Sequence, residues 1–527
     1  MALTFMQAGT ALIVLVAFRF IWVGSKQTKK SLPLPPGPKG LPLIGNFQDL
    51  PPPGVQEWVH WTHHKDLYGP ISSVTVMGQT IVILNDPEAA IELLEKRSAI
   101  YSARPRLVFA FEMCGWLNFL SSLPPGQRFR SYRKYLHSLL GASQLLDRFG
   151  QLQEQEVAHC LLRILQTPQD LIKHIRTEAG AIILKIAYGY TIEPHRPDPL
   201  VSLADEALDQ FSQAAVPGKW LVDIVPALRH LPEWFPGAGF KRTAKQWNHT
   251  LEQVVEAPHK FVEHQISKGA APDSFLGDYL KNEKLASEQE LDVKFTTASL
   301  YTGGADTTVA TLSSFSLAMM LHPEVQKKAQ EEIDRVVGTD RLPTFSDRPN
   351  LPYIDAMVKE SLRWHPIGPM GLPHASTQAD EYNGYLIPEG AILLQNIWLF
   401  THDPETYRDP MRFKPARFIQ TDDHAAELDP TRYVFGFGRR ICPGRVLADQ
   451  SIYLTIAQML AVFDISKPDG VEVAPEFLDG IISHPKPFQA NIRARDAQRE
   501  KLIRDLEMKF PWEQSDAHDI EGLIRKL

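Results

Sequence analysis

Hydrophobic and polar residues recur along the chain with two different periods, and these periods predict its elements. Short runs with β-type alternation occur at 71–84 (ISSVTVMGQTIVIL) and 384–397 (GYLIPEGAILLQNI). Helical patterns are more numerous, and the clearest runs from Glu290 to Leu321, about 48 Å at 1.5 Å per residue. Pro323 then occupies the favoured first-turn position of a further helix, PEVQKKAQEEIDRVVG. The pattern predicts a mainly α fold with small β-sheets.

A long and mainly apolar run lies near the start, at residues 3–24 (LTFMQAGTALIVLVAFRFIWVG). As a helix it would span about 33 Å, enough for the core of a bilayer. Gln7 and Arg19 interrupt it near its two ends, and three lysines follow between 26 and 30. The positive-inside rule therefore predicts a single transmembrane anchor at 1–25 with the rest of the chain in the cytosol. A cleaved signal peptide fits less well, because no basic residue precedes the run and no clear cleavage site follows.

A proline-rich stretch, LPLPPGPKGLPLIGN at 32–46, follows the anchor and favours extended polyproline geometry. We interpret residues 26–46 as a basic and proline-rich hinge. No second linker, repeat or low-complexity tract appears before about residue 493, so one large catalytic domain is expected at 47–493. The highly charged residues 494–527 read as a solvated helix or tail.

Composition excludes some classes of protein. The formal net charge is −7, the isoelectric point is about 6.2, and no long basic run with interleaved aromatics is present, so nucleic-acid binding has little support. Cys114, Cys160 and Cys442 are too few and too far apart for a disulfide framework or a paired-cysteine zinc site. A reducing compartment fits this usage best.

One of these cysteines stands in an unusual setting, FGFGRRICPG at 435–444. A nucleophilic cysteine would need a base close in space, and no protease-like signature surrounds Cys442. A phosphate-binding loop would need a third glycine that is missing here. An axial thiolate ligand to haem iron needs close approach of the chain to a flat macrocycle, which glycines at 436, 438 and 444 permit, while Arg440 suits a propionate. A buried structural cysteine in a turn is the remaining alternative.

The spacing FxxGxRxCxG, formed by Phe435, Gly438, Arg440, Cys442 and Gly444, resembles the haem-binding loop of the cytochrome P450 family. The resemblance implies the fold of that family and a haem b cofactor. It implies Cys442 as the axial ligand of the iron, and the other four residues of the loop as contacts of the cofactor.

A second segment, GGADTT at 303–308, resembles the oxygen-activation motif of the same family. Adjacent residues on a helix point about 100° apart, so Asp306 and Thr307 must have different tasks. We expect the Thr307 hydroxyl to bond back to the carbonyl of Gly303, opening the helix for O2. An alcohol there can donate protons at the iron, and the carboxylate can relay them from water. A helix cap or a packing kink is the alternative without function.

Further segments match the family. Glu360 and Arg363 in KESLRWHP form an i, i+3 pair, and Arg417 in FKPARF matches the arginine that completes a buried structural network behind the haem. The resemblance implies His374 and Arg133 as partners of haem propionates. Where the family usually has Trp, four residues before Arg133, this chain has Phe129, which has no indole N–H to donate.

The resemblance covers about residues 32–493 and is nearest to fungal microsomal members of the O-methylsterigmatocystin oxidoreductase type. It implies a monooxygenase of the endoplasmic reticulum membrane that oxidises a hydrophobic small molecule with O2. No nicotinamide or flavin fingerprint appears, so the electrons of NADPH would come through NADPH–cytochrome P450 reductase, with cytochrome b5 as a further partner. A peroxide-using or rearranging relative, and a non-catalytic haem sensor, stay open as alternatives.

Residues that would line the substrate pocket follow from the same resemblance and share an apolar or small character. They are the 101–123 segment, Ser299, Gly303, the 367–373 segment and 481–483. Such a lining indicates a hydrophobic ligand and does not identify the substrate.

Overall fold

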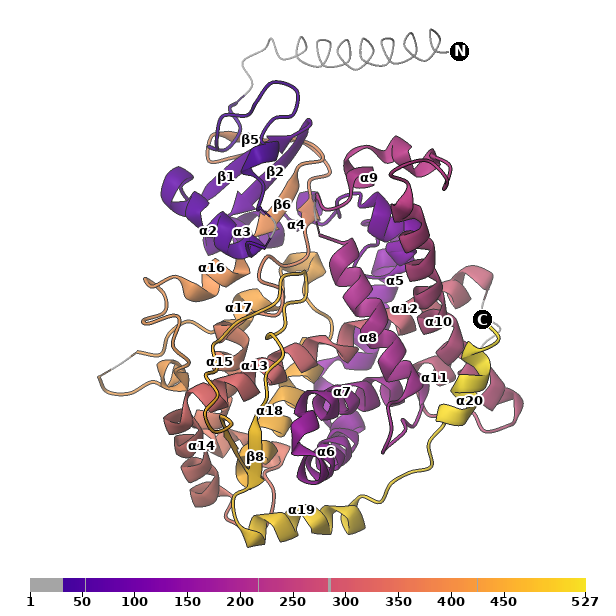
Figure 1. Ribbon diagram of the computed structural model, residues 1–527, viewed down its shortest axis with the longest axis vertical. Coiled ribbons are helices and arrows are strands. Elements are labelled where there is room, and N and C mark those ends of the chain that lie inside the picture. The colour runs from indigo at the N-terminus through magenta and orange to yellow at the C-terminus, as the bar shows by residue number, and fades with distance from the viewer. Residues whose placement is uncertain (1–31, 53, 217, 283–285, 424) are drawn as a thin grey trace. The chain divides into compact units, whose positions relative to one another are not determined.

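The computed structural model describes residues 32–52, 54–216, 218–282, 286–423 and 425–527. The chain forms two compact units (Figure 1). The first, here called the sheet unit, contains the described residues up to Pro105 together with Pro373–Gln395. The second, the helical unit, contains Arg106–Leu372 and Asn396–Leu527. The expectation of a mainly helical protein with small sheets is confirmed.

The sheet unit is built on a four-stranded sheet of order β1 (Ile71–Val76), β2 (Gln79–Leu84), β6 (Ile392–Gln395), β3 (His374–Ala375). β1 and β2 form the antiparallel hairpin that the alternating run predicted, β6 pairs parallel to β2, and β3 pairs antiparallel to β6. The two-residue turn has positive φ at Met77 (48°) and Gly78 (87°), the geometry that matches strand twist. The unit also contains α2 (Glu57–Tyr68), α3 (Pro87–Ala90), α4 (Ser98–Tyr101), and the small sheet of β4 (Asp380–Tyr382) and β5 (Tyr385–Ile387).

The helical unit has two hydrophobic cores, the first around α7, α8, α10 and α12 and the second around α6, α13, α14, α15 and α18. Its helices are α5 (Gln127–Leu140), α6 (Ala142–Gln166), α7 (Leu171–Tyr188), α8 (Pro199–Ala214), α9 (Leu221–Ile224), α10 (Gly239–Ser267), α11 (Phe275–Asn282), α12 (Ser287–Ala305), α13 (Thr307–Leu321), α14 (Pro323–Val336), α15 (Pro352–Trp364), α16 (Ile397–His402), α17 (Thr431–Val434), α18 (Arg445–Val462), α19 (Ala497–Lys509) and α20 (Ala517–Ile524). A two-stranded sheet joins β7 (Phe463–Ser466) to β8 (Asn491–Ala494).

The segment expected to be one helix from Glu290 to Leu321 is two helices, so that prediction was wrong in its continuity. α12 ends at Ala305 and α13 begins at Thr307, because Asp306 leaves helical geometry at φ −123° and ψ −30°. The Thr307 hydroxyl donates to the carbonyl of Gly303 at 2.9 Å, as predicted, and so competes for the acceptor of a helix N–H. The break brings α12 into the first core and α13 into the second.

The C-terminal residues are not a solvated tail, which corrects the expectation from their charge. α19 packs on α6, and α20 packs on α10 and α8; both lie at the yellow end of the chain in Figure 1. Ile503 and Ile520 are fully buried and Leu506 nearly so. A few apolar positions at helical spacing decide the packing, although charged residues dominate the composition.

The described residues include no helix that is both long enough and apolar enough to cross a bilayer. The predicted anchor at 1–25 lies outside the described residues.

Candidate active site

Cys442 lies in a tight loop of the helical unit, three residues before α18 begins. Its backbone N–H donates to the carbonyl of Phe435 at 2.8 Å, which closes the loop. Gly436 and Gly438 within it have φ of 77° and 52°, the left-handed region that side chains with a Cβ disfavour. The loop therefore depends on glycine at both positions.

The environment of the Cys442 sulfur acts on its charge in two directions. Surrounding protein raises the pKa of the thiol, while a hydrogen bond from the Gly444 amide and the cations Arg133 and Arg445 oppose that rise. The N-terminus of α18 favours negative charge at the same place. A positive ion bound to the sulfur would complete this arrangement and hold it as thiolate.

Arg440 bridges the loop to the segment that precedes α5. Its guanidinium donates to the carbonyls of Leu120, at 3.1 Å, and Leu123. The same group lies 4.1 Å from the ring centre of Phe129, within the range of a cation–π contact. Burial, followed by repulsion from Arg133, lowers the pKa of Arg440 to about 10. Phe129 thus supports the arginine through its ring face, although it has no N–H to donate.

Arg133 approaches the loop from α5 and donates to the carbonyl of Ile441 at 2.5 Å. Burial lowers its pKa, and Arg445 lowers it further, while Cys442 raises it. Among the ion pairs of the described residues, none joins Arg133 to a carboxylate. Arg133 is half-buried and lies near Arg440, whose pKa is also lowered. An anionic group bound here would stabilise both charges.

These residues fit a flat, anionic cofactor with a metal at its centre. The donor is a single soft sulfur with an amide directed at it, the two arginines suit carboxylates, and the glycine loop allows close approach. The end of α12, next to the start of α13, is a second place where a glycine would allow close approach of a flat group. A Cβ placed on Gly303 would meet no atom within 4 Å, and Gly303 is exposed although its neighbours Thr302 and Ala305 are buried.

The neighbouring glycine has the opposite surroundings. A Cβ on Gly304 would lie 2.8 Å from two carbon atoms of Ile183 on α7, so this position needs glycine for helix packing. Gly303 and Thr307 lie four residues apart and therefore on the same face. Packing of Gly304 against α7 fixes the direction in which the open face of Gly303 points.

Asp306 lies on a different side of the break and is only 7% exposed. Its Oδ2 lies 2.9 Å from Nε2 of His484, and its Oδ1 lies 3.6 Å from Nη2 of Arg176. Arg176 in turn pairs with Asp205 of α8 at 2.9 Å. Burial would raise the pKa of Asp306, but His484 first and Arg176 second hold it below its usual value. Sequence reasoning missed both partners, since they come from a distant loop and from α7.

Glu360, Arg363 and Arg417 meet in the helical unit, and all three are buried. Arg363 holds both carboxylate oxygens of Glu360 at 2.7 and 2.9 Å, and Arg417 donates to the same carboxylate at 3.2 Å. The remaining donors of Arg363 bond the carbonyls of Thr401 and Arg412. A buried charge group this fully hydrogen-bonded fixes the backbone around α15 and the segment before residue 418.

Other expected site residues have different surroundings. His374 belongs to the sheet unit, where its Nδ1 bonds the carbonyl of Tyr101 at 2.7 Å. The Ser299 hydroxyl accepts from the amide of Leu120 and donates to the carbonyl of Phe295. The Ser483 hydroxyl bonds His365 and the carbonyl of Leu478. Both serines use their hydroxyls to hold the protein together.

Comparison with known proteins gives a consistent result along almost the whole chain. The family model described as Cytochrome P450 matches residues 35–492. The chain is 50% identical to cytochrome P450 monooxygenase claR of Ampulloclitocybe clavipes over 92% of this chain and 91% of the relative. It is 46% identical to cytochrome P450 monooxygenase ppsD of Aspergillus oryzae, over 97% and 98%. It is 44% identical to O-methylsterigmatocystin oxidoreductase of Aspergillus flavus, over 94% of each chain.

Proposed function

The chain belongs to the cytochrome P450 family and is a monooxygenase, and we propose that it oxidises a hydrophobic small molecule of fungal secondary metabolism through a haem-thiolate centre. In the overall reaction, one atom of O2 enters a C–H bond of the substrate. The other leaves as water, with two electrons and two protons consumed. The observation that carries this proposal is the setting of Cys442, a single cysteine in a glycine loop with an amide and two arginines around its sulfur.

The residues that would hold the haem come from two parts of the helical unit. Cys442 would bind the iron, Arg440 and Arg133 would pair with the propionates, and the loop from Phe435 to Gly444 would cover one face. Haem bound through a thiolate supplies reductive activation of O2, because the sulfur donates electron density that favours O–O cleavage. His374 of the sheet unit is a further proposed propionate partner, from family resemblance alone.

Proton delivery is assigned to the break between α12 and α13. The Thr307 hydroxyl lies on the open face of Gly303 and is oriented by its bond to that carbonyl at 2.9 Å. The Asp306 carboxylate, buried on another side, is held ionised by His484 and Arg176. A carboxylate that is ionised but in contact with a partly exposed imidazole can exchange protons with solvent and pass them towards the alcohol.

The network of Glu360, Arg363 and Arg417 has a structural role in this proposal. Its guanidinium groups have their bonds within the protein and take no part in binding the cofactor. Its task is to hold the backbone around α15 and the segment before residue 418 in place.

Electrons are proposed to come from NADPH through NADPH–cytochrome P450 reductase, with cytochrome b5 as a second donor. This follows the use of separate redox partners in the family. Residues 1–25 are proposed as a single-pass anchor in the endoplasmic reticulum membrane, supported by the apolar run at 3–24 and the lysines after it. The catalytic domain at 47–493 would then face the cytosol.

The carbon monoxide difference spectrum of the reduced protein tests the ligand assignment. Thiolate ligation should give a strongly red-shifted band that is absent in C442S. The variant C114A removes another free cysteine, which is buried, and should keep the band. A histidine-type spectrum in the unchanged protein would remove the basis of the proposal.

Turnover with purified reductase separates the monooxygenase from its alternatives. A monooxygenase should consume NADPH and O2 only with reductase present. Oxidation of substrate by peroxide at an equal rate without reductase would indicate a peroxide-using enzyme, and absence of any turnover with a bound substrate would indicate a sensor.

A further inference from the structure

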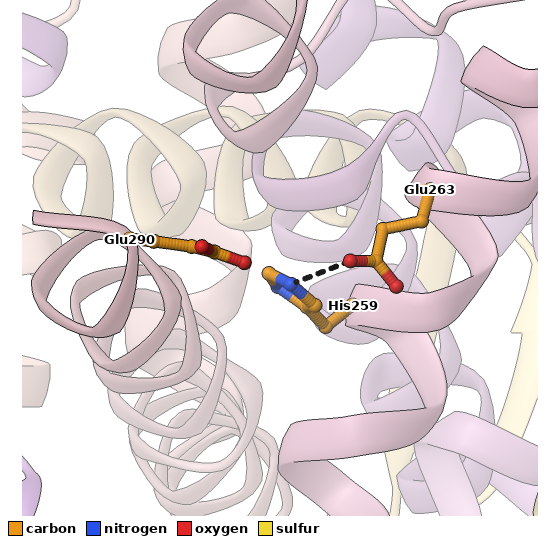
Figure 2. A group of neighbouring side chains, drawn as sticks. All are labelled: His259, Glu263 and Glu290. Atoms are coloured by element: carbon orange, nitrogen blue, oxygen red, sulfur yellow. Dashed lines mark ion pairs between the residues drawn. The ribbon is translucent and has the colours of Figure 1, made fainter. Parts of the chain in front are cut away.

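A histidine and two glutamates of the helical unit converge away from the Cys442 loop. They are His259 and Glu263, one turn apart on α10, and Glu290 in the first turn of α12 (Figure 2). Figure 2 shows the imidazole lying between the two carboxylates. One ligand-type atom of each residue lies within 4.8 Å of those of the other two. Within the described part of the chain, no other group of three such residues comes this close.

The histidine is the decisive member of this group, because it is only 4% exposed. Its Nδ1 is buried without a hydrogen-bond partner, and its Nε2 lies 3.5 Å from Oε1 of Glu263, longer than a normal hydrogen bond. Burial lowers the pKa of His259 to about 4, and the charge of Lys294 adds to this. With its proton on the buried Nδ1, the neutral His259 ring presents the lone pair of Nε2 towards Glu263.

A neutral imidazole cannot compensate the two carboxylates, and Lys294, a cation that acts on Glu263, has another partner. Lys294 of α12 forms an ion pair with Glu256 of α10. Lys260 lies one turn after Glu256 on the same helix. Burial raises the pKa of Glu263, and the charges of Glu290 and Glu256 raise it further, although Lys294 and Lys260 oppose them. The cluster thus places two carboxylates beside an imidazole nitrogen, Nε2, that forms no normal hydrogen bond with Glu263.

We propose that His259, Glu263 and Glu290 form a binding site for a divalent transition-metal ion of the zinc class. One imidazole nitrogen and two carboxylate oxygens are a ligand set that Zn²⁺ accepts, with water in the remaining position. Metal–ligand distances near 2.0–2.2 Å require the two glutamates to move inwards by roughly 1 Å. Both are exposed and so have room for this movement, and solvent gives the ion a path of entry.

The site would clip α10 to α12. Apart from side-chain packing, the Lys294–Glu256 ion pair joins these helices close to the cluster. An ion held by two residues of α10 and one of α12 would tie the first turn of α12 to α10 and restrain their relative movement. The ion would stabilise the folded chain, because it binds that state and not the unfolded one.

Titration of the full-length haem protein with Zn²⁺ against a fluorescent zinc chelator tests the proposal. The unchanged protein should have one Zn²⁺ site per chain that is tighter than its other Zn²⁺ sites. Its melting midpoint should rise with Zn²⁺ but not with Mg²⁺. E263Q and E290Q should each weaken this binding at least about tenfold and abolish the rise. Because both glutamates are exposed, neither variant should disturb folding; H259N should weaken binding as well.

Two controls distinguish the site from general binding by surface groups. E288Q removes an exposed glutamate from the same first turn of α12, and H264N removes an exposed histidine of α10. Both should keep the affinity of the unchanged protein. Equal affinity in E263Q, E290Q and the unchanged protein would mean adventitious zinc only and would overturn the proposal, as would the absence of a one-to-one site or an equal rise with Mg²⁺.

Discussion

Nε2 of His484 lies 2.9 Å from Oδ2 of Asp306, across 178 residues of sequence. The contact joins a loop near the C-terminal sheet to the break in the long helix. Arg176 stands 3.6 Å from the other carboxylate oxygen, which has no hydrogen bond of its own. Asp306 therefore has a close imidazole and a more distant guanidinium as neighbours, and the imidazole lowers its pKa more than the guanidinium does.

Replacing His484 by alanine should raise the pKa of Asp306, because burial then outweighs the remaining charge of Arg176. In the unchanged protein that pKa is depressed on folding. The stability it contributes is present above the unfolded value, about 3.9, and is lost as pH falls through the folded value. In H484A, where burial lifts the folded pKa above the unfolded value, this acid-side loss should disappear and its sign should reverse, so that the variant gains stability relative to the unchanged protein as pH falls. Melting curves of both proteins between about pH 3 and pH 7 would measure the difference.

In H484A the ratio of product formed to NADPH consumed should be lower. The pH below which this ratio falls should be higher than in the unchanged protein. K486Q changes a charge on the same loop, where Lys486 pairs with Glu476, and serves as the control. Parallel profiles for H484A and K486Q would show that His484 has no part in proton delivery.

Thr307→Ala should release peroxide in place of product, because the alcohol that donates protons is gone while NADPH oxidation continues. The ratio of product to NADPH should fall several-fold. T308A changes the adjacent residue, about 100° around the helix, and should leave the ratio nearly unchanged. Unaltered coupling in T307A would rule out the assigned role of its hydroxyl.

Phe129→Leu should weaken haem retention, because the ring under Arg440 is lost. The cation–π contact and its packing are worth about 1–2 kcal/mol in a buried setting. F129W keeps an aromatic face there and should retain haem better than F129L. Transfer of haem to apomyoglobin measures the difference, and equal transfer rates in the two variants would contradict this function of the ring.

Ile503→Ala should destabilise the helical unit by about 2–5 kcal/mol, because the side chain is fully buried between α19 and α6. The comparison is Met508→Ala on the same helix, where the side chain is 80% exposed and little change is expected. Chemical denaturation of both variants measures the two effects. Equal stability would mean that α19 packs loosely in solution.

The features predictable from sequence were local ones. The hairpin at 71–84, the proline-started helix at 323 and the bond from Thr307 to Gly303 each depend on residues a few positions apart. Their geometry follows from backbone preference and short-range hydrogen bonds. The Cys442 loop belongs to this class, because glycine at fixed positions shapes it.

The features that sequence reasoning missed depend on contacts between distant segments. Nothing near His484 in the sequence indicates that its partner is Asp306. The ring of Phe129 was judged by the N–H it has lost, whereas its contact with Arg440 uses the π face. The docking of α19 was hidden because three buried side chains, Ile503, Leu506 and Phe510, stand among many charged ones.

Arg440 holds the segment before α5 by main-chain carbonyls, those of Leu120 and Leu123, and Ser299 holds the same segment by a main-chain amide. Main-chain groups are the same for every amino acid. Side chains along this segment can therefore be exchanged during evolution, or by an engineer, without disconnecting the loop that carries Cys442. Relatives can differ in what they accept here and still keep identical chemistry.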